Sequence, residues 1–230
     1  NFVSLATALT LSRFQAQASV VEQVVKDHVK YGMSSPSRST LTPAFFVNVY
    51  PFNSKLLAVR AFAKKSFRMP TFNDLYYADM GNSKLNPESA LQYDLGFVLN
   101  KDWKQGVVDH FRLQLDGYYN TVHDKIVAYP KGQQFRWTML NLGKVHIKGV
   151  DAMAEVGLEP AKDLKVTARL QYTYQDARDV TNPNTSYYKD QIPYIPWNSG
   201  SAILALSWRE WDLSYSFIYS GERYSQQENI

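Results

Sequence analysis

Histidine is the side chain that most often performs acid–base catalysis or binds metal near neutral pH, and this chain has four: His28, His110, His123 and His146. No two of them have the spacing of a metal-binding motif such as H-E-x-x-H. His123 and Asp124 are adjacent, which places their side chains on opposite faces of a strand. The absence of cysteine excludes thiol nucleophiles, zinc–thiolate sites and iron–sulfur sites. The sequence also has no nucleophile elbow and no phosphate-binding glycine loop. We therefore expect no enzyme, no resident cofactor and no metal centre.

Aromatic and arginine side chains are the better candidates for contact with a ligand. They suit large, flat or anionic molecules, through stacking and charge-assisted hydrogen bonds. Several occur in segments rich in Pro, Asn, Ser and Tyr that interrupt the periodic parts of the chain. The alternative is that these side chains contact only water and surrounding sugars. The candidates are Tyr76, Tyr77, Arg136, Trp137, Tyr187, Tyr188 and Tyr194.

The segments that must position these side chains have a hydrophobic period of two, which indicates β-strands. In residues 90–99, for example, Leu91, Tyr93 and Leu95 alternate with Gln92 and Asp94. The pattern predicts an all-β fold of about nine strands, several of them longer than the usual ~5–6 residues. The clearest strands are residues 90–99, 111–120, 164–174 and 211–220, and weaker ones are 2–14, 39–52, 56–68, 138–158 and 198–208.

The links between these strands alternate in length, which predicts an antiparallel meander with short turns at one end and long loops at the other. Residues 16–30 could instead form an amphipathic helix, but their valine content favours extension of a strand. The short links are residues 51–55, 101–108, 159–163 and 209–210, and the long ones are 15–37, 70–88, 129–137 and 180–197.

Long strands with one apolar face and loops sorted by length are typical of a transmembrane β-barrel. No run of ~18 apolar residues occurs, so we expect no transmembrane helix. Tyr and Trp gather towards strand ends, as in the aromatic girdles of such barrels, although these residues favour strands in any protein. The net charge of +4 comes from interspersed charges, so we expect no nucleic-acid partner. The side chains of one face would then contact outer-membrane lipid.

Four motifs in order resemble the family of TonB-dependent outer-membrane receptors. Residues 65–77, KSFRMPTFNDLYY, resemble the S-F-R-x-P-T-x-x-[DE]-L sequence of that family. Gly81-Asn82 followed by Leu85-Asn86-Pro87-Glu88 is similar to its G-N-x-x-L-x-P-E sequence. The strand Q-Y-D-L-G at 92–96 continues the resemblance, and N-L-G-K-V-H-I-K-G-V-D at 141–151 resembles N-x-G-x-x-x-x-x-G-[VF]-[DE]. The resemblance covers at least residues 65–151.

Physically, these motifs are structural. Pro70 has no N–H and should end a strand after Arg68. Asp74 is placed to accept hydrogen bonds from the backbone of a turn. Residues 85–88 should return the chain to the sheet. Gly149 interrupts a strand pattern and suggests a bulge or bend.

The resemblance implies a plugged transmembrane barrel of about 22 strands in the outer membrane of a Gram-negative bacterium. It implies energy-coupled uptake of a scarce nutrient, such as a metal chelate of the iron–siderophore class, haem or cobalamin. It also implies a TonB complex as partner, acting through an N-terminal plug. We interpret residues 1–230 as one partial barrel domain from the second half, with the plug and the final strands absent and with unpaired edges at its first and last strands.

Three other classes remain open at this point. A passive porin-like barrel would share the loops and girdles but would need no plug. A soluble all-β binding module, such as a sandwich or a propeller, would need polar residues facing out on both sheets and no apolar belt. A barrel hydrolase would need a serine–histidine pair in the wall, and the sequence indicates none.

Overall fold

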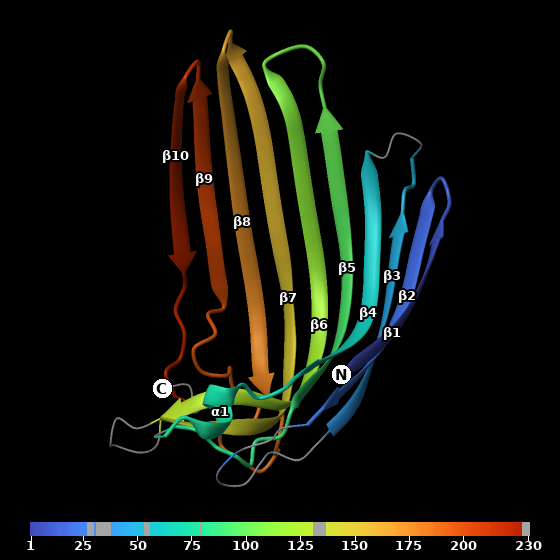
Figure 1. Ribbon diagram of the computed structural model, residues 1–230. Helices are drawn as coiled ribbons and strands as arrows, with labels where there is room; N and C mark the ends of the chain where they lie inside the picture. The colour runs from blue at the N-terminus through green and yellow to red at the C-terminus, as the bar shows by residue number, and fades with distance from the viewer. Residues whose placement is uncertain (27–29, 31–37, 53–55, 79, 131–136, 227–230) are drawn as a thin grey trace.

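The computed structural model describes residues 1–26, 30, 38–52, 56–78, 80–130 and 137–226. They form one antiparallel sheet of ten strands in which spatial order equals chain order, β1 to β10. Figure 1 shows the short turns at one end of the strands and the long loops, with a short helix, at the other end. The strands are β1 (Phe2–Thr10), β2 (Phe14–Val25), β3 (Arg38–Val49), β4 (Leu57–Arg68), β5 (Glu88–Asp102), β6 (Val108–Pro130), β7 (Trp137–Ala161), β8 (Leu164–Asp179), β9 (Asn198–Trp208) and β10 (Trp211–Ser220).

The all-β meander and the alternation of link lengths are confirmed. Short links join β1 to β2, β5 to β6, β7 to β8 and β9 to β10. The last two are the tightest, with two residues each, so that Ala161 pairs with Leu164 and Trp208 with Trp211. The long links include residues 69–87 and 180–197. The link between β6 and β7 is shorter than predicted, because both strands extend into the region expected to be loop.

The count of nine strands was wrong, because β2 lies inside the segment predicted as the link 15–37. The strand alternative for residues 16–30 is confirmed as far as Val25. The period of two is obscured there because valines stand side by side, Val20 with Val21 and Val24 with Val25, so that both faces look equally apolar. β2 nevertheless pairs along its whole length with β1 and β3.

Of the bulge or bend predicted at Gly149, the bulge is contradicted, because pairing of β7 with β6 and with β8 is continuous through Gly149. The register shifts lie at the short-turn end instead, between Val108 and His110 and between Leu158 and Ala161. Nearer the loop end the pairing also skips Asp124, whose φ is 54°, between the pairs His123–Lys144 and Lys125–Leu142. Leu142 and Val145 lie on β7, on either side of this bend at Asp124. One has an even and the other an odd number, yet both side chains pack in the same buried cluster, so the alternation of faces changes phase here.

The two faces of the sheet differ in chemistry. Leu95 and Phe97 of β5 point to one face, where they are 53 % and 46 % exposed, and Asp94 and Gly96 point to the other. We call these the apolar face and the polar face. Within the described residues no second layer covers the apolar face, and the side chains that expose their apolar surface there belong to most of the strands. They include Phe45, Leu91, Tyr93, Leu115, Tyr119, Val150, Leu170 and Tyr172.

Ion pairs on the polar face tie neighbouring strands together. Arg60 of β4 reaches across β5 and binds both carboxylate oxygens of Asp116 on β6, with nitrogen–oxygen distances of 2.6 and 2.7 Å from its Nη2. Gly96 makes this possible, because a Cβ there would lie 1.9 Å from Asp116 Oδ1. Nearer the short turns, buried Glu155 accepts a hydrogen bond from Arg112 at 3.1 Å and pairs with Arg169.

Candidate functional site

The long-loop end contains the short helix α1 (Phe72–Tyr76), which follows β4 directly. Thr71 and Asp74 form a capping box: Asp74 accepts a hydrogen bond from the Thr71 N–H at 2.8 Å, and Thr71 Oγ1 accepts one from the Asp74 N–H at 3.2 Å. The predicted role of Asp74 in holding backbone N–H groups is therefore confirmed. The sequence analysis expected a turn here, because a five-residue helix is too short to show a 3.6-residue period.

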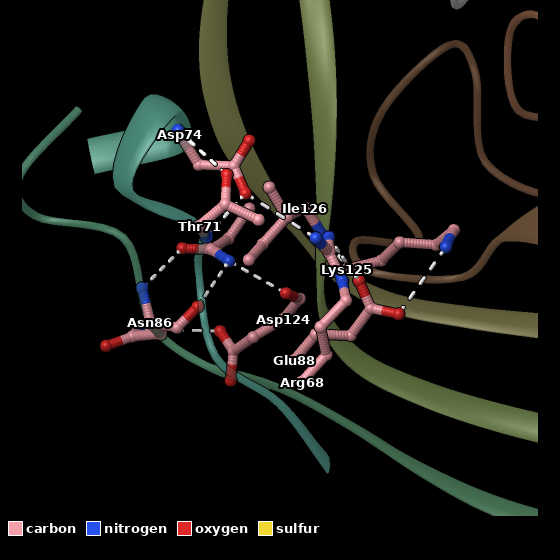
Figure 2. Close-up of polar contacts among 9 residues, drawn as sticks. Arg68, Thr71, Asp74, Asn86, Glu88, Asp124, Lys125 and Ile126 are labelled. Carbon is pink, nitrogen blue, oxygen red and sulfur yellow. Dashed lines mark hydrogen bonds and ion pairs between the residues drawn. The ribbon is translucent and has the colours of Figure 1, made fainter. Parts of the chain in front are cut away.

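Charged side chains connect this helix to β5 and β6, as Figure 2 shows. Arg68, the last residue of β4, contacts Asp74 at 3.5 Å and Glu88 at 3.1 Å. Glu88, the first residue of β5, also accepts a hydrogen bond from the Ile126 N–H at 3.1 Å and pairs with Lys125 Nζ at 3.5 Å. Both carboxylates are largely buried, so each needs these partners.

Asn141 connects β7 to the segment before β5 and to the bend in β6. Its amide oxygen accepts a hydrogen bond from the Asn86 N–H at 2.8 Å. Its Nδ2 donates to the backbone oxygens of Asn86 at 3.0 Å and Asp124 at 2.7 Å. Asn82 makes a parallel link by donating to the Met139 carbonyl at 3.1 Å. The β6–β7 hairpin is therefore fixed at its bend by residues of a distant loop.

Two small apolar clusters complete this end. The helix cluster consists of Leu75, Leu85 and Ile126, each at most 6 % exposed. The loop cluster joins the loop end of β6, β7 and β8 to the 180–197 loop, and its members are Val122, Leu142, Val145, Ile147, Ala177 and Ile192.

The 180–197 loop is held to β8 by a buried glutamine. Gln191 accepts a hydrogen bond from the Ala177 N–H at 2.8 Å and donates to the carbonyls of Gln175 and Ile195 at 3.4 and 3.3 Å. The start of the same loop packs on β7, where Gly143 lies against Thr181. A Cβ at this glycine would lie 2.5 Å from Thr181 Cγ2. Residues of three of the four motifs thus meet one another, or the loops beside them, at one end of the sheet, whereas the motif at 92–96 lies in the middle of β5.

A cavity of about 390 Å³ lies between the bent end of the β6–β7 hairpin and the 180–197 loop. Trp137 and Tyr194 line it together, with ring centroids 5.6 Å apart and a 49° angle between the planes. The Tyr194 N–H donates to the carbonyl of Tyr224 at 2.9 Å, so the chain after β10 also supports the site. The remaining lining is Lys125, Val127, Ala128, Tyr129, Leu142, Ile192, Pro193 and Ile195.

The structure brings together only this pair among the predicted ligand-contact residues that it describes. Tyr76 packs on the helix cluster and its ring lies 5.0 Å from that of Phe72, whereas Tyr77 is exposed at the C-terminus of α1. Tyr187 and Tyr188 lie in a turn of the 180–197 loop, where Lys189 Nζ lies 5.3 Å from the Tyr188 ring. Arg136 lies outside the described residues, as does His28.

Sequence reasoning missed Lys125 and Tyr129 as lining residues. Both stand in a strand that the alternation seemed to end at residue 120, so nothing in the pattern placed them beside the 180–197 loop. Among the described residues no group of three or more His, Cys, Asp or Glu side chains is placed to hold a metal ion. The helices of the described part of the chain include none long and apolar enough to cross a membrane.

Comparisons with known proteins agree with this geometry. Curated relatives include the vitamin B12 transporter BtuB of Photobacterium profundum, 27 % identical over 176 residues, which are 75 % of this chain and 26 % of the relative. The corresponding protein of Vibrio vulnificus is 28 % identical over 115 residues, 49 % of this chain and 16 % of that protein. The chain thus spans about a quarter or less of the length of these relatives.

Two solved structures share the fold. The apoprotein form of the FrpB iron transporter from Neisseria meningitidis (F5-1 variant) matches 95 % of this chain and 32 % of its own, with a TM-score of 0.59 and 16 % identity. The copper transporter OprC matches 92 % of this chain and 33 % of its own, with a TM-score of 0.60 and 17 % identity. A family model described as TonB dependent receptor-like, beta-barrel, matches residues 8–229. The ten-stranded sheet is part of such a barrel, and the chain belongs to the TonB-dependent receptor β-barrel family.

Proposed function

We propose that this chain forms part of the wall and of the extracellular ligand-binding loops of an outer-membrane receptor that takes up a scarce nutrient with energy from TonB. The nutrient class is iron–siderophore, haem or cobalamin. The observation that carries the proposal is the long-loop end, where motif residues fix the loops beside a cavity lined by Trp137 and Tyr194. Membership of a family of receptors and transporters, rather than enzymes, supports it.

The sheet itself supports a position within a larger wall. Within the described residues β1 pairs only with β2, and β10 pairs only with β9, so each presents one unpaired edge. Unpaired strand edges are avoided in stable proteins, and barrels remove them by closure. We propose that residues 1–230 are a partial barrel domain whose two edges pair with further strands, and that a plug fills the lumen beside the polar face.

The cavity suits a ligand with an aromatic or other flat group. Trp and Tyr rings supply faces for stacking, and Lys125, whose ammonium group is paired with Glu88, adds its stem to the same lining. A flat metal chelate suits this chemistry. Contacts from Tyr76, Tyr77, Tyr187, Tyr188 and Arg136 remain part of the proposal.

The test is uptake by a receptor-deficient Gram-negative strain that produces the full-length protein containing this chain. Cells receive labelled ferric siderophore, haem iron or cyanocobalamin, with and without a functional TonB. We expect accumulation of one of these nutrients that disappears without TonB. Accumulation that persists without TonB would favour the passive porin, and a protein that is monodisperse without detergent would favour the soluble binding module.

The site is tested in the same assay. Trp137→Ala combined with Tyr194→Ala should reduce uptake about tenfold at limiting nutrient, which corresponds to ~1.4 kcal/mol of binding. Tyr215→Ala, which removes an exposed tyrosine of β10 outside the cavity, is the matched control. Equal uptake by the double variant and the control would remove the cavity from the ligand site.

A further inference from the structure

The apolar face changes its chemistry at one level near the long-loop end. Side chains that are neighbours across the strands form rows, and one row is apolar from β3 to β8: Val47, Ala61, Leu95, Gly117, Val150 and Tyr174. The next row towards the long loops contains Tyr93, Tyr119, Lys148 and Asp176. The row beyond it contains Lys65, His146 and Arg178, and the one after that His123 and Lys144. Among the described residues of these rows on β4 to β8, Asp176 is the only one with a carboxylate side chain.

A groove of about 670 Å³ lies at this boundary. Ala61, Ala63 and Gly117 are its small residues on this face, Tyr93, Tyr119 and Tyr174 are among its aromatic ones, and Lys148 joins its lining. A Cβ at Gly117 would have the Leu95 carbonyl oxygen, 4.0 Å away, as its neighbour, so the space above this glycine is open. The groove is therefore largely apolar and bordered by a positive charge.

Buried Asp176 organises the cations at the loop end of the groove. Its Oδ1 accepts a hydrogen bond from Arg178 Nε at 2.7 Å, and its Oδ2 lies 3.3 Å from Lys148 Nζ. Lys148 remains 65 % exposed and Arg178 43 % exposed, so both still face outwards. The guanidinium of Arg178 also lies 5.6 Å from the centre of the Trp197 ring. Two cations share one carboxylate, which leaves a net positive charge held in place.

We propose that this groove and its cations bind a phosphorylated glycolipid of the outer leaflet, with an acyl chain along Gly117 and a phosphate at Lys148 and Arg178. The proposal rests on the proposed function, because it takes the long-loop end as the outer side of the membrane. Charge complementarity and the continuity of the apolar groove with the cations argue for this occupant. Tyrosines lie between the two, at the depth where amphipathic rings favour a membrane interface. Arginine and lysine are the side chains that bind phosphate.

The experiment uses the full-length protein in detergent and native mass spectrometry to measure bound diphosphoryl lipid A. Lys148→Gln removes one cation and leaves Asp176 paired with Arg178, and Gly117→Leu fills the groove. We expect about tenfold weaker binding of lipid A by either variant, as the loss of one good contact implies. Lys101→Gln is the matched control, because Lys101 lies on the same face at the short-turn end, beside Trp103. It should bind lipid A like the unaltered protein.

Two further ligands distinguish a site for a lipid-borne phosphate from a site for free phosphate. Dephosphorylated lipid A should bind about tenfold more weakly than the phosphorylated lipid, and excess inorganic phosphate should not displace the lipid. Equal binding of both lipids, displacement by phosphate alone, or equal binding by all variants would overturn the proposal. Heat-modifiable mobility on gels verifies that each variant is folded. An unaltered protein that transports its nutrient but binds no lipid A refutes this inference alone, whereas an unaltered protein that binds lipid A without TonB-dependent uptake refutes the proposed function alone.

Discussion

The middle of the wall and its long-loop end use the same strands but are stabilised by different contacts. In the middle, each strand contributes apolar side chains to one face, such as Leu95 and Leu115, and polar ones to the other. Any residue of the right class would satisfy that pattern. At the loop end, Asn141 makes three hydrogen bonds to the backbone of Asn86 and Asp124. Glu88 contacts Arg68, Lys125 and the Ile126 N–H. Composition specifies the first region, and individual residues specify the second.

The difference explains where three of the four sequence motifs lie; the fourth, at 92–96, lies in the wall. A period of two can recur in many sequences, so most of the wall needs no fixed residues. The Glu88 carboxylate forms ion pairs with an arginine and a lysine and accepts a hydrogen bond from a backbone N–H, so it tolerates no shift of position along the chain. The motif residues Arg68, Asp74, Glu88 and Asn141 are therefore concentrated where loops must be held against the ends of strands.

The strongest test of this comparison places a charge on each face of the wall. Leu115→Lys, on the apolar face, should disfavour insertion into a bilayer by about 2–4 kcal/mol, because the charge would lie in lipid. Gln114→Lys, on the polar face beside Asp116, should have little effect. Equilibrium unfolding of the full-length protein in lipid vesicles measures both. Equal effects would contradict the assignment of the two faces.

At the loop end, Asn141→Ala should destabilise the structure by about 1–3 kcal/mol, because Asn86 and Asp124 would lose their partners in a partly buried place. The effect should be local, with faster proteolysis of the β6–β7 hairpin and an unaltered wall. Asn100→Ala, on an exposed position of β5, serves as the control. Proteolysis rates that do not differ between the two variants would show that the bend is held by other contacts.

Within the wall, Gly96 is a position where a single residue matters as it does at the loop end. Gly96→Ala would bring a Cβ against Asp116 and disturb its pair with Arg60, at a cost of roughly 1–2 kcal/mol given the partial exposure of the arginine. Gly117→Ala, on the next strand with open space above it, should be nearly neutral. Comparing the denaturant midpoints of these two variants measures the difference, and a reversed order would refute the role of Gly96.

Most of the wall could be predicted from the sequence because alternation is a local property. The predicted strands at 164–174, 198–208 and 211–220 agree with β8, β9 and β10 apart from the loop end of β8. β2 was missed because adjacent valines blur the period. The loop end of β6 was missed because its alternation changes phase at Asp124: Val122 before it and Val127 after it pack in the same cluster. Tertiary contacts with the helix cluster and with the 180–197 loop, rather than local pattern, keep that end in strand conformation.

The candidate site was less predictable. Residue type favoured aromatic side chains, yet it gave no reason to join Trp137 with Tyr194, which are 57 residues apart and meet beyond the irregular point at Asp124. The same bend takes Lys125 to the cavity. A bend that depends on Asn86 and Asn141 has no signal in the alternation, so the site follows from the motif contacts rather than from the strands.

The strict agreement between spatial order and chain order has a consequence for how such a wall changes in evolution. Because each strand neighbours only its predecessor and its successor, insertion or loss of one hairpin leaves every other pairing intact. Strand direction and the side on which the loops emerge are both preserved by adding two strands, and both are reversed downstream by adding one. The hairpin is therefore the unit in which the circumference of this wall can grow or shrink.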